Sequence, residues 1–282
     1  MKTTGSLGTI RSILPYKEAD AAFIKNKADP FLVKAFQSSF QELNFENGWC
    51  AVVPSGVEKD YLQDKVEVLA LGNFAQWGRL NEVRQNLTSF LKEYTIMSDE
   101  IMKKTIDYVE RLTASFTEAL GEDTAYVLLR TRQPTDTDDE GFYKLRWHED
   151  ARFFDPTVSR PYKLLIALNG RSTVMGKPTE AQYRHFKEFE QKSLDLKRAG
   201  KVEEGRELYR VKVDAFMDEN VSQMWFEDCS RAIVHTYPLH PDDLASVHAE
   251  PPIDCHRIFV SVVPGPSIAK RATVKKRPRK KD

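Results

Sequence analysis

The sequence between Thr124 and Leu168 contains two apolar runs, TAYVLLRT (124–131) and YKLLIAL (162–168), with the tetrapeptide WHED (147–150) between them. Both runs are rich in β-branched and aromatic residues, which is typical of strands. Similar short runs, most of them bounded by Pro, Gly, Asp or Asn, occupy Tyr143–Trp147, Arg231–Thr236 and Arg257–Val263. We therefore expect an antiparallel β domain over residues 123–264.

A helical hairpin is expected to interrupt this β domain at residues 179–219. Thr179, followed three positions later by Gln182, has the pattern of a capping box. Apolar residues then recur at helical spacing on either side of Gly200, a residue that commonly ends helices. They are Tyr183, Phe186 and Phe189 before the glycine and Leu208, Val211, Ala215 and Phe216 after it. The hairpin could be a lid, a dimer contact or surface decoration.

Residues 1–122 have the pattern of a mostly helical supporting region. Ser98 is a good N-cap, and Gly121 a good C-terminal stop, for a helix between them. Helical spacing of apolar residues is found at 29–43, 77–94 and 98–121. Two short apolar runs, Trp49–Val53 and Val66–Leu71, predict strands between the first two helices.

The tetrapeptide WHED carries the strongest chemical signal in the chain. Successive side chains of a strand point to opposite faces, so His148 and Asp150 share one face while Glu149 points the other way. An imidazole and a carboxylate about 7 Å apart along a strand can bind one metal ion. A third ligand from another strand would complete a two-histidine, one-carboxylate site that leaves coordination positions open.

The H-x-D pattern is weak by itself, because chance produces such pairs in chains with six histidines. A second copy, His240-Pro241-Asp242, is present. Proline removes a hydrogen bond from a strand ladder, and Pro-Asp-Asp is typical of a turn, so this second copy is the poorer candidate. A packed or surface histidine is the ordinary alternative for His148.

The C-terminal part of the β domain supplies partners for this pair. His248 lies in VHAEPP (247–252), just before the predicted strand that begins near Arg257. Arg257, Phe259 and Ser261 share one face of that strand. A guanidinium that points into a β domain needs an anionic partner, and its planar fork suits a carboxylate. A dicarboxylate could bind metal with one end and Arg257 with the other, with help from Ser261.

These motifs resemble the Fe(II)/2-oxoglutarate-dependent oxygenases, and most closely a bacterial branch with W-H-x-D and V-H-x-x-P-P motifs. The resemblance covers about residues 125–264 and rests on W-H-x-D, a strand ending in G-x-S-T (170–173), V-H-x-x-P-P and an arginine nine residues after its histidine. It implies an α+β protein with a jelly-roll core, that is, a double-stranded β-helix of the cupin-like type. The N-terminal helices would support this core, and the hairpin would be inserted into it.

The resemblance also implies a ligand set and a reaction. His148, Asp150 and His248 would bind Fe(II), and Arg257 would bind the distal carboxylate of 2-oxoglutarate. Oxidative decarboxylation of 2-oxoglutarate with O2, giving succinate and CO2, would drive hydroxylation or demethylation of a substrate. His235, His240 and His256 are rival third ligands, so the distal histidine is less secure than the H-x-D pair. Trp147, Phe153, Phe154 and Tyr162 are expected to line a dry pocket or to be plain core aromatics.

Composition excludes several other classes. The chain lacks an apolar run of the roughly 18–20 residues that span a bilayer, and its first residues lack the apolar core of a secretory signal. Three widely spaced cysteines (Cys50, Cys229 and Cys255) argue against a disulfide scaffold and match no zinc pattern. No phosphate-binding glycine motif is present. A cytoplasmic protein without a membrane partner is expected.

The net charge of zero hides a basic tail. Residues Lys270 to Asp282 contain eight Lys or Arg and one Asp, so the rest of the chain carries 34 basic and 41 acidic residues. An acidic body is not a general nucleic-acid-binding surface. Residues 265–282 are expected to be disordered. The cluster Lys270–Lys281 is either a nuclear import signal, recognised by an import receptor, or a solvated basic end.

Two other functions fit the same residues. A cupin-type metal protein would bind metal without 2-oxoglutarate, and a non-catalytic jelly-roll binding protein would be directed by its basic tail. The substrate stays open among protein side chains, nucleic acid, lipid and small metabolites, because a fold does not fix its target.

Overall fold

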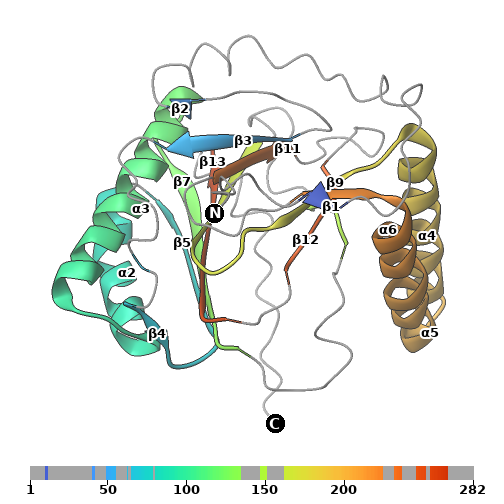
Figure 1. Cartoon of the computed structure of the whole chain (residues 1–282), viewed down its shortest axis with the longest axis horizontal. Coiled ribbons are helices and arrows are strands. Elements are labelled where there is room, and N and C mark those ends of the chain that lie inside the picture. Colours follow the sequence, from blue (N-terminus) through green and yellow to red (C-terminus); the bar gives the residue numbers. More distant parts are fainter. Residues whose placement is uncertain are drawn as a thin grey trace, which may run out of the picture.

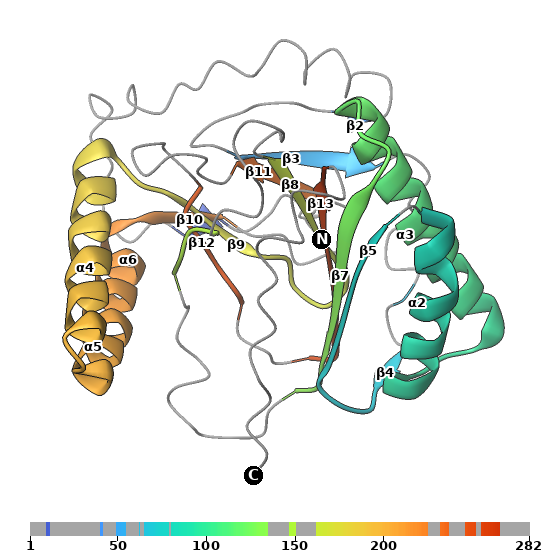
Figure 2. The same cartoon turned by 180° about the vertical axis from the view of Figure 1, so that it is seen from behind.

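The computed structural model describes residues 10–11, 40–41, 49–54, 62, 65–78, 80–134, 147–150, 162–224, 232–236, 246–251 and 255–265. These residues form an α+β structure in which every strand pairing is antiparallel. Figures 1 and 2 show helices α2 and α3 on one side of the strands and helices α4 to α6 on the other. The predicted combination of antiparallel sheets with helices is confirmed at this level.

Most strands belong to two sheets. The large sheet has the order β2-β3-β11-β8-β13-β7-β5, and the small sheet has the order β1-β10-β9-β12. The large sheet consists of β2 (Phe40–Gln41), β3 (Trp49–Pro54), β11 (Ala232–Thr236), β8 (Tyr162–Asn169), β13 (Arg257–Pro264), β7 (Ala125–Arg132) and β5 (Gly72–Gly78). The small sheet consists of β1 (Ile10–Arg11), β10 (Ser222–Met224), β9 (Val174–Lys177) and β12 (His248–Ala249). A separate pair joins β4 (Glu67–Val68) to β6 (Thr95–Ile96).

The chain crosses repeatedly between the two sheets from β7 onward. Strand β7 lies in the large sheet, and His148 then forms an antiparallel bridge to His248 at the edge of the small sheet. The chain continues through β8 in the large sheet, β9 and β10 in the small sheet, β11 in the large sheet, β12 in the small sheet and β13 in the large sheet. This route brings His148 beside His248, although a hundred positions separate them in the sequence.

The two faces of the large sheet contact different layers. Leu164, Ile166 and Leu168 of β8 pack in one core with α2 (Leu80–Tyr94) and α3 (Asp99–Ala119). A second cluster contains residues from both sheets, namely Trp49, Leu165, Met175, Ile233 and Phe259. Because side chains alternate along a strand, Arg257 and Ser261 lie on the same face of β13 as Phe259. That shared face was predicted from the sequence.

The boundaries of α3 follow from its end residues, as expected. The Ser98 side chain accepts a hydrogen bond from the Ile101 N–H at 3.3 Å. Gly121 has φ +70° just beyond the last helical turn, a conformation that favours glycine. Helix α2 begins at Leu80 rather than near Trp77, because Trp77 is still part of β5.

The helical insertion is also as expected, with one added feature. The capping box of Thr179 and Gln182 begins α4 (Glu180–Arg198), and Gly200 ends it with φ +82°. The predicted second helix is divided into α5 (Val202–Glu207), a π-helical turn η2 (Leu208–Val213) and α6 (Asp214–Asn220). The insertion leaves the small sheet at Lys177 and returns at Ser222, and these two residues are paired across β9 and β10.

Several local predictions need correction. Phe40 lies in β2 and pairs with Pro54, so the helical spacing predicted for 29–43 does not extend to it. The strand predicted at Val66–Leu71 is only Glu67–Val68. Strands β5, β9, β10 and β12 were not predicted, because most are too short for two-residue periodicity to show. Residues 1–122 were predicted to be a mostly helical support for the β domain. In the described part of this region, however, β3 and β5 are themselves strands of the large sheet.

Other predictions lie outside the described residues. They concern most of the helix at 29–43, the run at 143–146, the second H-x-D copy at 240–242, and the tail after residue 265. Among the helices that the structure describes, none combines the length and apolar character that a membrane crossing requires.

Replacement of Phe116 by alanine tests the core between α3 and the large sheet. This side chain is completely buried. We expect Phe116→Ala to lower the free energy of unfolding by about 3–5 kcal/mol in urea titrations, because it leaves a cavity. The exposed neighbour Glu118→Ala is the matched control and should change stability by less than about 0.5 kcal/mol. Equal effects of the two substitutions would contradict this packing.

Candidate metal centre

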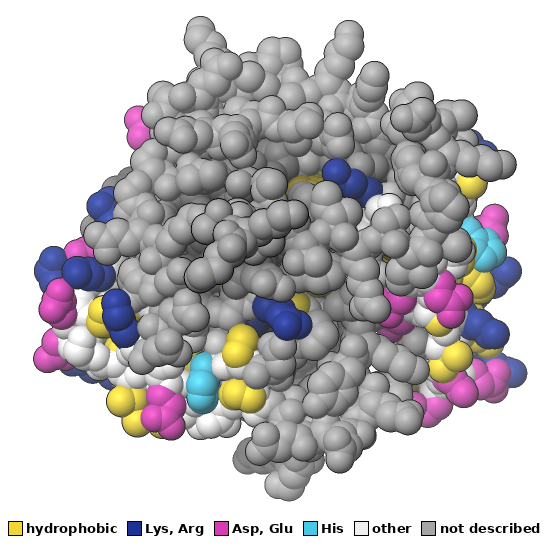
Figure 3. Space-filling view, viewed as in Figure 1, with side chains coloured by type: hydrophobic (Ala, Val, Ile, Leu, Met, Phe, Trp, Pro, Cys, Tyr) yellow, Lys and Arg dark blue, Asp and Glu magenta, His cyan; other side chains and the backbone are white. Residues whose placement is uncertain are grey.

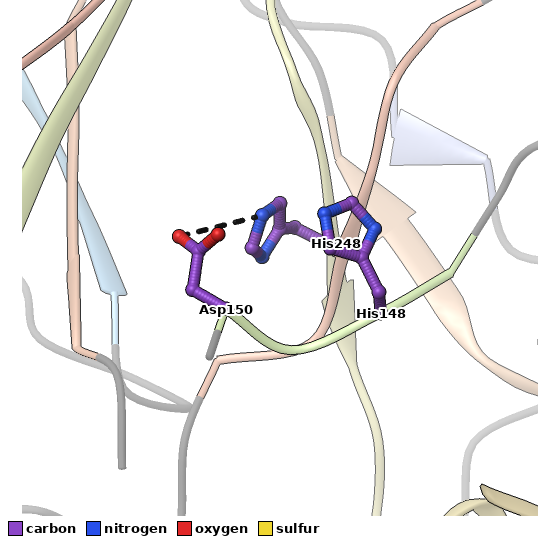
Figure 4. Close-up of side chains that lie close together, drawn as sticks. All are labelled: His148, Asp150 and His248. Atoms are coloured by element: carbon purple, nitrogen blue, oxygen red, sulfur yellow. Dashed lines mark ion pairs between the residues drawn. The ribbon is translucent and has the colours of Figure 1, made fainter. Parts of the chain in front are cut away.

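Three predicted ligands converge at the edge of the small sheet. His148, Asp150 and His248 each offer one ligand atom, and these atoms all lie within 4.8 Å of one another. Figure 4 shows the two imidazoles and the carboxylate directed toward a common region. The backbone sets this arrangement, because the His148 N–H donates to the His248 carbonyl at 2.8 Å and the His248 N–H donates to the His148 carbonyl at 2.9 Å. This group could hold a metal ion.

The carboxylate of Asp150 lies among cationic and imidazole groups. Its Oδ2 atom is 2.6 Å from Lys163 Nζ, 3.3 Å from His235 Nε2 and 3.8 Å from His248 Nε2. Burial alone would raise the pKa of this carboxyl, but the adjacent Lys163 ammonium holds it well below its usual range. Asp150 is therefore an anion at neutral pH, which is the form that binds metal.

His248 is held in the form that coordinates metals. Its side chain is buried, and its ring centroid lies 4.4 Å from that of His148. Burial first, and then the adjacent His148, hold the pKa of His248 well below its usual value. A neutral imidazole carries a lone pair for a metal without first losing a proton.

The rival histidines have separate positions. His256 accepts a hydrogen bond from the Val68 N–H at 3.1 Å through Nδ1, so it interacts with β4. His235 lies beside the cluster, with its ring centroid 4.7 Å from that of His248 and its Nδ1 2.7 Å from Ser246 Oγ. His240 lies outside the described residues. Of the described candidates, His248 completes the three-residue group, and His235 contacts it from one side.

Arg257 has the orientation that the sequence predicted. It is 3% exposed, its Nε donates to the Arg171 carbonyl at 3.0 Å, and its guanidinium lies 4.6 Å from the Phe259 ring centroid. Its Nη2 is buried without a hydrogen-bond partner among the described residues. Burial lowers the pKa of Arg257 to about 10, although the nearby Glu250 carboxylate acts in the opposite direction. The guanidinium is therefore a cation at neutral pH. Ser261 is buried on the same face.

A cavity of about 1050 Å³ opens beside the ligand group. His148, Trp147 and Glu250 form part of its wall, together with Arg130 and Arg132 from β7. Its opposite wall comes from the insertion and consists of Lys197, Glu203, Arg206, Glu207, Tyr209, Val211 and Asp214. Figure 3 shows acidic and basic side chains intermixed over the insertion at the right of the view.

The predicted aromatic pocket is only partly observed. Trp147 borders the cavity, but its side chain is completely buried and belongs to the core between the insertion and the small sheet. Tyr162 belongs to the core beneath α2 and α3, which corresponds to the plain core alternative. Phe153 and Phe154 lie outside the described residues.

The insertion holds the ligand-bearing segment by its backbone. The Trp147 N–H donates to Asp214 Oδ1 at 3.0 Å, and the Tyr209 hydroxyl donates to the Trp147 carbonyl at 2.6 Å. The Trp147 indole N–H donates to Asp218 Oδ1 at 2.8 Å. Tyr209 lies in the π-helical turn η2, a deviation often found at functional sites. The backbone N–H and C=O groups of Trp147, the residue before His148, are thus both hydrogen-bonded to the insertion.

Glu149 adds a further link to the insertion. Alternation directs it away from His148, as predicted, and its carboxylate accepts hydrogen bonds from the Tyr183 hydroxyl and, at 2.7 Å, from Lys187 Nζ. Burial raises the pKa of Glu149, while Lys187 and Tyr183 oppose that shift. The insertion therefore interacts with both residues that flank His148, which surface decoration would not do.

Sequence reasoning missed Lys163, Tyr209 and Asp214. A lysine within the apolar run YKLLIAL (162–168) is the one signal that was available, because a charged residue in a buried strand needs a partner. Nothing in the spacing of Tyr209 or Asp214 indicates a contact with a segment more than sixty positions away.

No family model matches this chain, and no curated protein matches it in sequence. The fold and the site define the class of protein. The chain is an α+β protein of antiparallel sheets whose His148, Asp150 and His248 form a group able to hold a metal ion.

The link between the insertion and the metal site predicts a specific effect. Tyr209→Phe removes the hydroxyl that holds the Trp147 carbonyl, and we expect metal affinity to fall by up to about tenfold, because this contact acts on His148 through the preceding residue. Metal dissociation constants measured under anaerobic conditions test this. Val211→Ala, an exposed position in the same turn, is the control and should leave affinity unchanged. A similar loss in both variants would count against a positioning role.

Proposed function

We propose that this protein is an Fe(II)/2-oxoglutarate-dependent oxygenase that hydroxylates or demethylates a substrate. The observation that carries the proposal is the convergence of His148, Asp150 and His248 within 4.8 Å. Two imidazoles and one carboxylate are the facial donor set of such enzymes, and they leave positions for a cosubstrate and dioxygen. The buried Arg257, with Nη2 unsatisfied among the described residues, supports the same assignment.

We further propose that the core is a jelly roll of the double-stranded β-helix type. The support is the route of the chain, which passes from β7 to His148, β8, β9, β10, β11, β12 and β13 while alternating between two sheets. The cluster with Trp49, Leu165 and Met175 packs side chains of both sheets together, as a double-sheet core requires.

The residues fit the proposed cofactors in chemistry and charge. His148, Asp150 and His248 would hold Fe(II), and Arg257, with Ser261 on the same face, would bind the distal carboxylate of 2-oxoglutarate. The bound iron would supply the oxidative chemistry, coupled to decarboxylation of 2-oxoglutarate to succinate. Lys163 bonds one oxygen of Asp150, and such outer contacts orient a carboxylate ligand. The hydrogen bonds from the insertion would keep His148 in place.

A second candidate is a cupin-type metal protein that does not use 2-oxoglutarate. His235 favours it, since its Nε2 lies 3.3 Å from Asp150 Oδ2 and a third imidazole could join the metal. An additional protein ligand would reduce the positions that remain for a chelating cosubstrate. Binding of Fe(II) without any response to 2-oxoglutarate would favour this candidate.

Anaerobic titration tests the metal and the cosubstrate together. We expect Fe(II) with 2-oxoglutarate to give a weak visible charge-transfer band, and iron-dependent succinate formation when oxygen is admitted. His148→Ala and Asp150→Ala should abolish both signals, with metal affinity reduced by more than about 100-fold because a direct ligand is lost. His185→Ala, an exposed histidine of α4, is the control. Retention of both signals in the ligand variants would refute the site.

Arg257→Gln separates the cosubstrate from the metal. The concentration of 2-oxoglutarate needed for half-maximal succinate formation should rise about tenfold or more, because a charge-assisted pair is lost, while Fe(II) affinity stays close to that of the parent protein. Arg184 is an exposed arginine of α4, and Arg184→Gln is the control, which should leave the 2-oxoglutarate requirement unchanged. If Arg257→Gln changed the iron affinity alone, the role assigned to the guanidinium would be wrong.

A further inference from the structure

Three arginines gather at one end of the inner face of the large sheet. Arg257 of β13 is directly opposite Arg132 of β7, and Phe259 is opposite Arg130, so all three guanidinium-bearing residues share a face. Alternation along the chain also places Glu250 on the same side as His248. The group formed by Arg130, Arg132, Arg257 and Glu250 thus carries three positive charges and one negative charge.

Glu250 neutralises only part of this charge. Its Oε1 lies 2.7 Å from Arg130 Nη1, and its Oε2 lies 3.8 Å from Arg132 Nη2. The Nε atom of Arg130 is buried without a hydrogen-bond partner among the described residues. Burial of a hydrogen-bond donor without a partner costs free energy, and the cost is larger when the donor belongs to a charged guanidinium. An anion bound at this end of the sheet would supply the missing partner.

Two of the arginines face the cavity. The side chains of Arg130 and Arg132 are 36% and 28% exposed, and both line the cavity with Glu250 and His148. Arg257, by contrast, is 3% exposed. The cosubstrate carboxylate assigned to Arg257 and an anion in the cavity would therefore use different guanidinium groups.

Two of the three carboxylates on the opposite wall, those of Glu203 and Asp214, have partners. Glu203 forms an ion pair with Arg206 at 2.5 Å, and Asp214 accepts the Trp147 N–H. Lys197 adds a cation, with its Nζ 5.6 Å from the Tyr209 ring centroid. A charged ligand group would therefore bind better at Arg130 and Arg132 than at the wall formed by the insertion, and that group would be an anion.

We propose that the cavity binds a ligand through an anionic group, a carboxylate or a phosphate, at Arg130 and Arg132. The planar forks of these side chains suit the oxygens of either group. The ligand would lie beside His148, with its remainder between β7 and the insertion. Its identification as the substrate of an oxygenase rests on the proposed function, whereas the anion site itself does not.

The test uses the full-length, metal-free protein, with inorganic phosphate as the probe. Binding of phosphate is measured from the line width of its ³¹P resonance at constant ionic strength. Phosphate should bind the parent protein, and Arg130→Gln and Arg132→Gln should each weaken binding about tenfold or more, since each removes a charged donor. Arg184→Gln should have no effect. Arg257→Gln should largely retain phosphate binding.

Glu250→Gln distinguishes a binding role from a structural one. It removes the carboxylate that competes for Arg130 and Arg132, so phosphate should bind several-fold more tightly than to the parent protein. Damage to the fold would have the opposite effect. Addition of Mn(II) should then broaden the bound phosphate resonance strongly, and Asp150→Ala should prevent that broadening because the ion is no longer held nearby.

The outcomes separate the two proposals. Phosphate binding without any metal binding would keep the anion site and remove the oxygenase. Three results would overturn the anion site: no phosphate binding by the parent protein, affinity in the Arg130→Gln and Arg132→Gln variants equal to that of the parent, or loss of binding only in Arg257→Gln.

Discussion

The antiparallel bridge between His148 and His248 is the contact on which the candidate site depends. Its two backbone hydrogen bonds, 2.8 and 2.9 Å long, join segments from opposite ends of the β domain. Asp150 follows by alternation once His148 is fixed, because residues two apart in an extended chain share a side. A single pair of peptide contacts therefore fixes the relative position of the three side chains of the candidate site.

Hydrogen bonds hold the residues on either side of His148, and charged side chains are buried close to them. On one side, hydrogen bonds from Tyr209, Asp214 and Asp218 hold Trp147, and on the other Lys163 holds Asp150. In the same region Arg257 and Glu250 are buried or half-buried. Groups of this kind are costly to bury, so their concentration around one cavity makes that cavity the candidate functional site of the molecule.

The elements that sequence patterns predicted well are those with strong local signals. Helix α3, with Ser98 and Gly121 at its ends, and the capping box at Thr179 depend on interactions within a few residues. His148 and Asp150 were predicted as a pair because alternation places them on one face, whereas His248 was assigned through the family resemblance, and the structure brings the three together. Strand β12 has two residues and carries no periodicity, so its pairing with β9 follows only from long-range packing. The contacts of Tyr209 and Lys163 are of the same long-range kind.

The entry and exit of the helical insertion lie side by side, since Lys177 of β9 pairs with Ser222 of β10. A segment whose ends meet in a hairpin can be exchanged for a short turn without altering the order of the strands around it. Here that segment also forms a wall of the cavity and is hydrogen-bonded to Trp147, the residue before His148 of the candidate metal site. Replacement of this one contiguous piece of chain would therefore change both the cavity wall and the support of His148, while the β framework stayed the same.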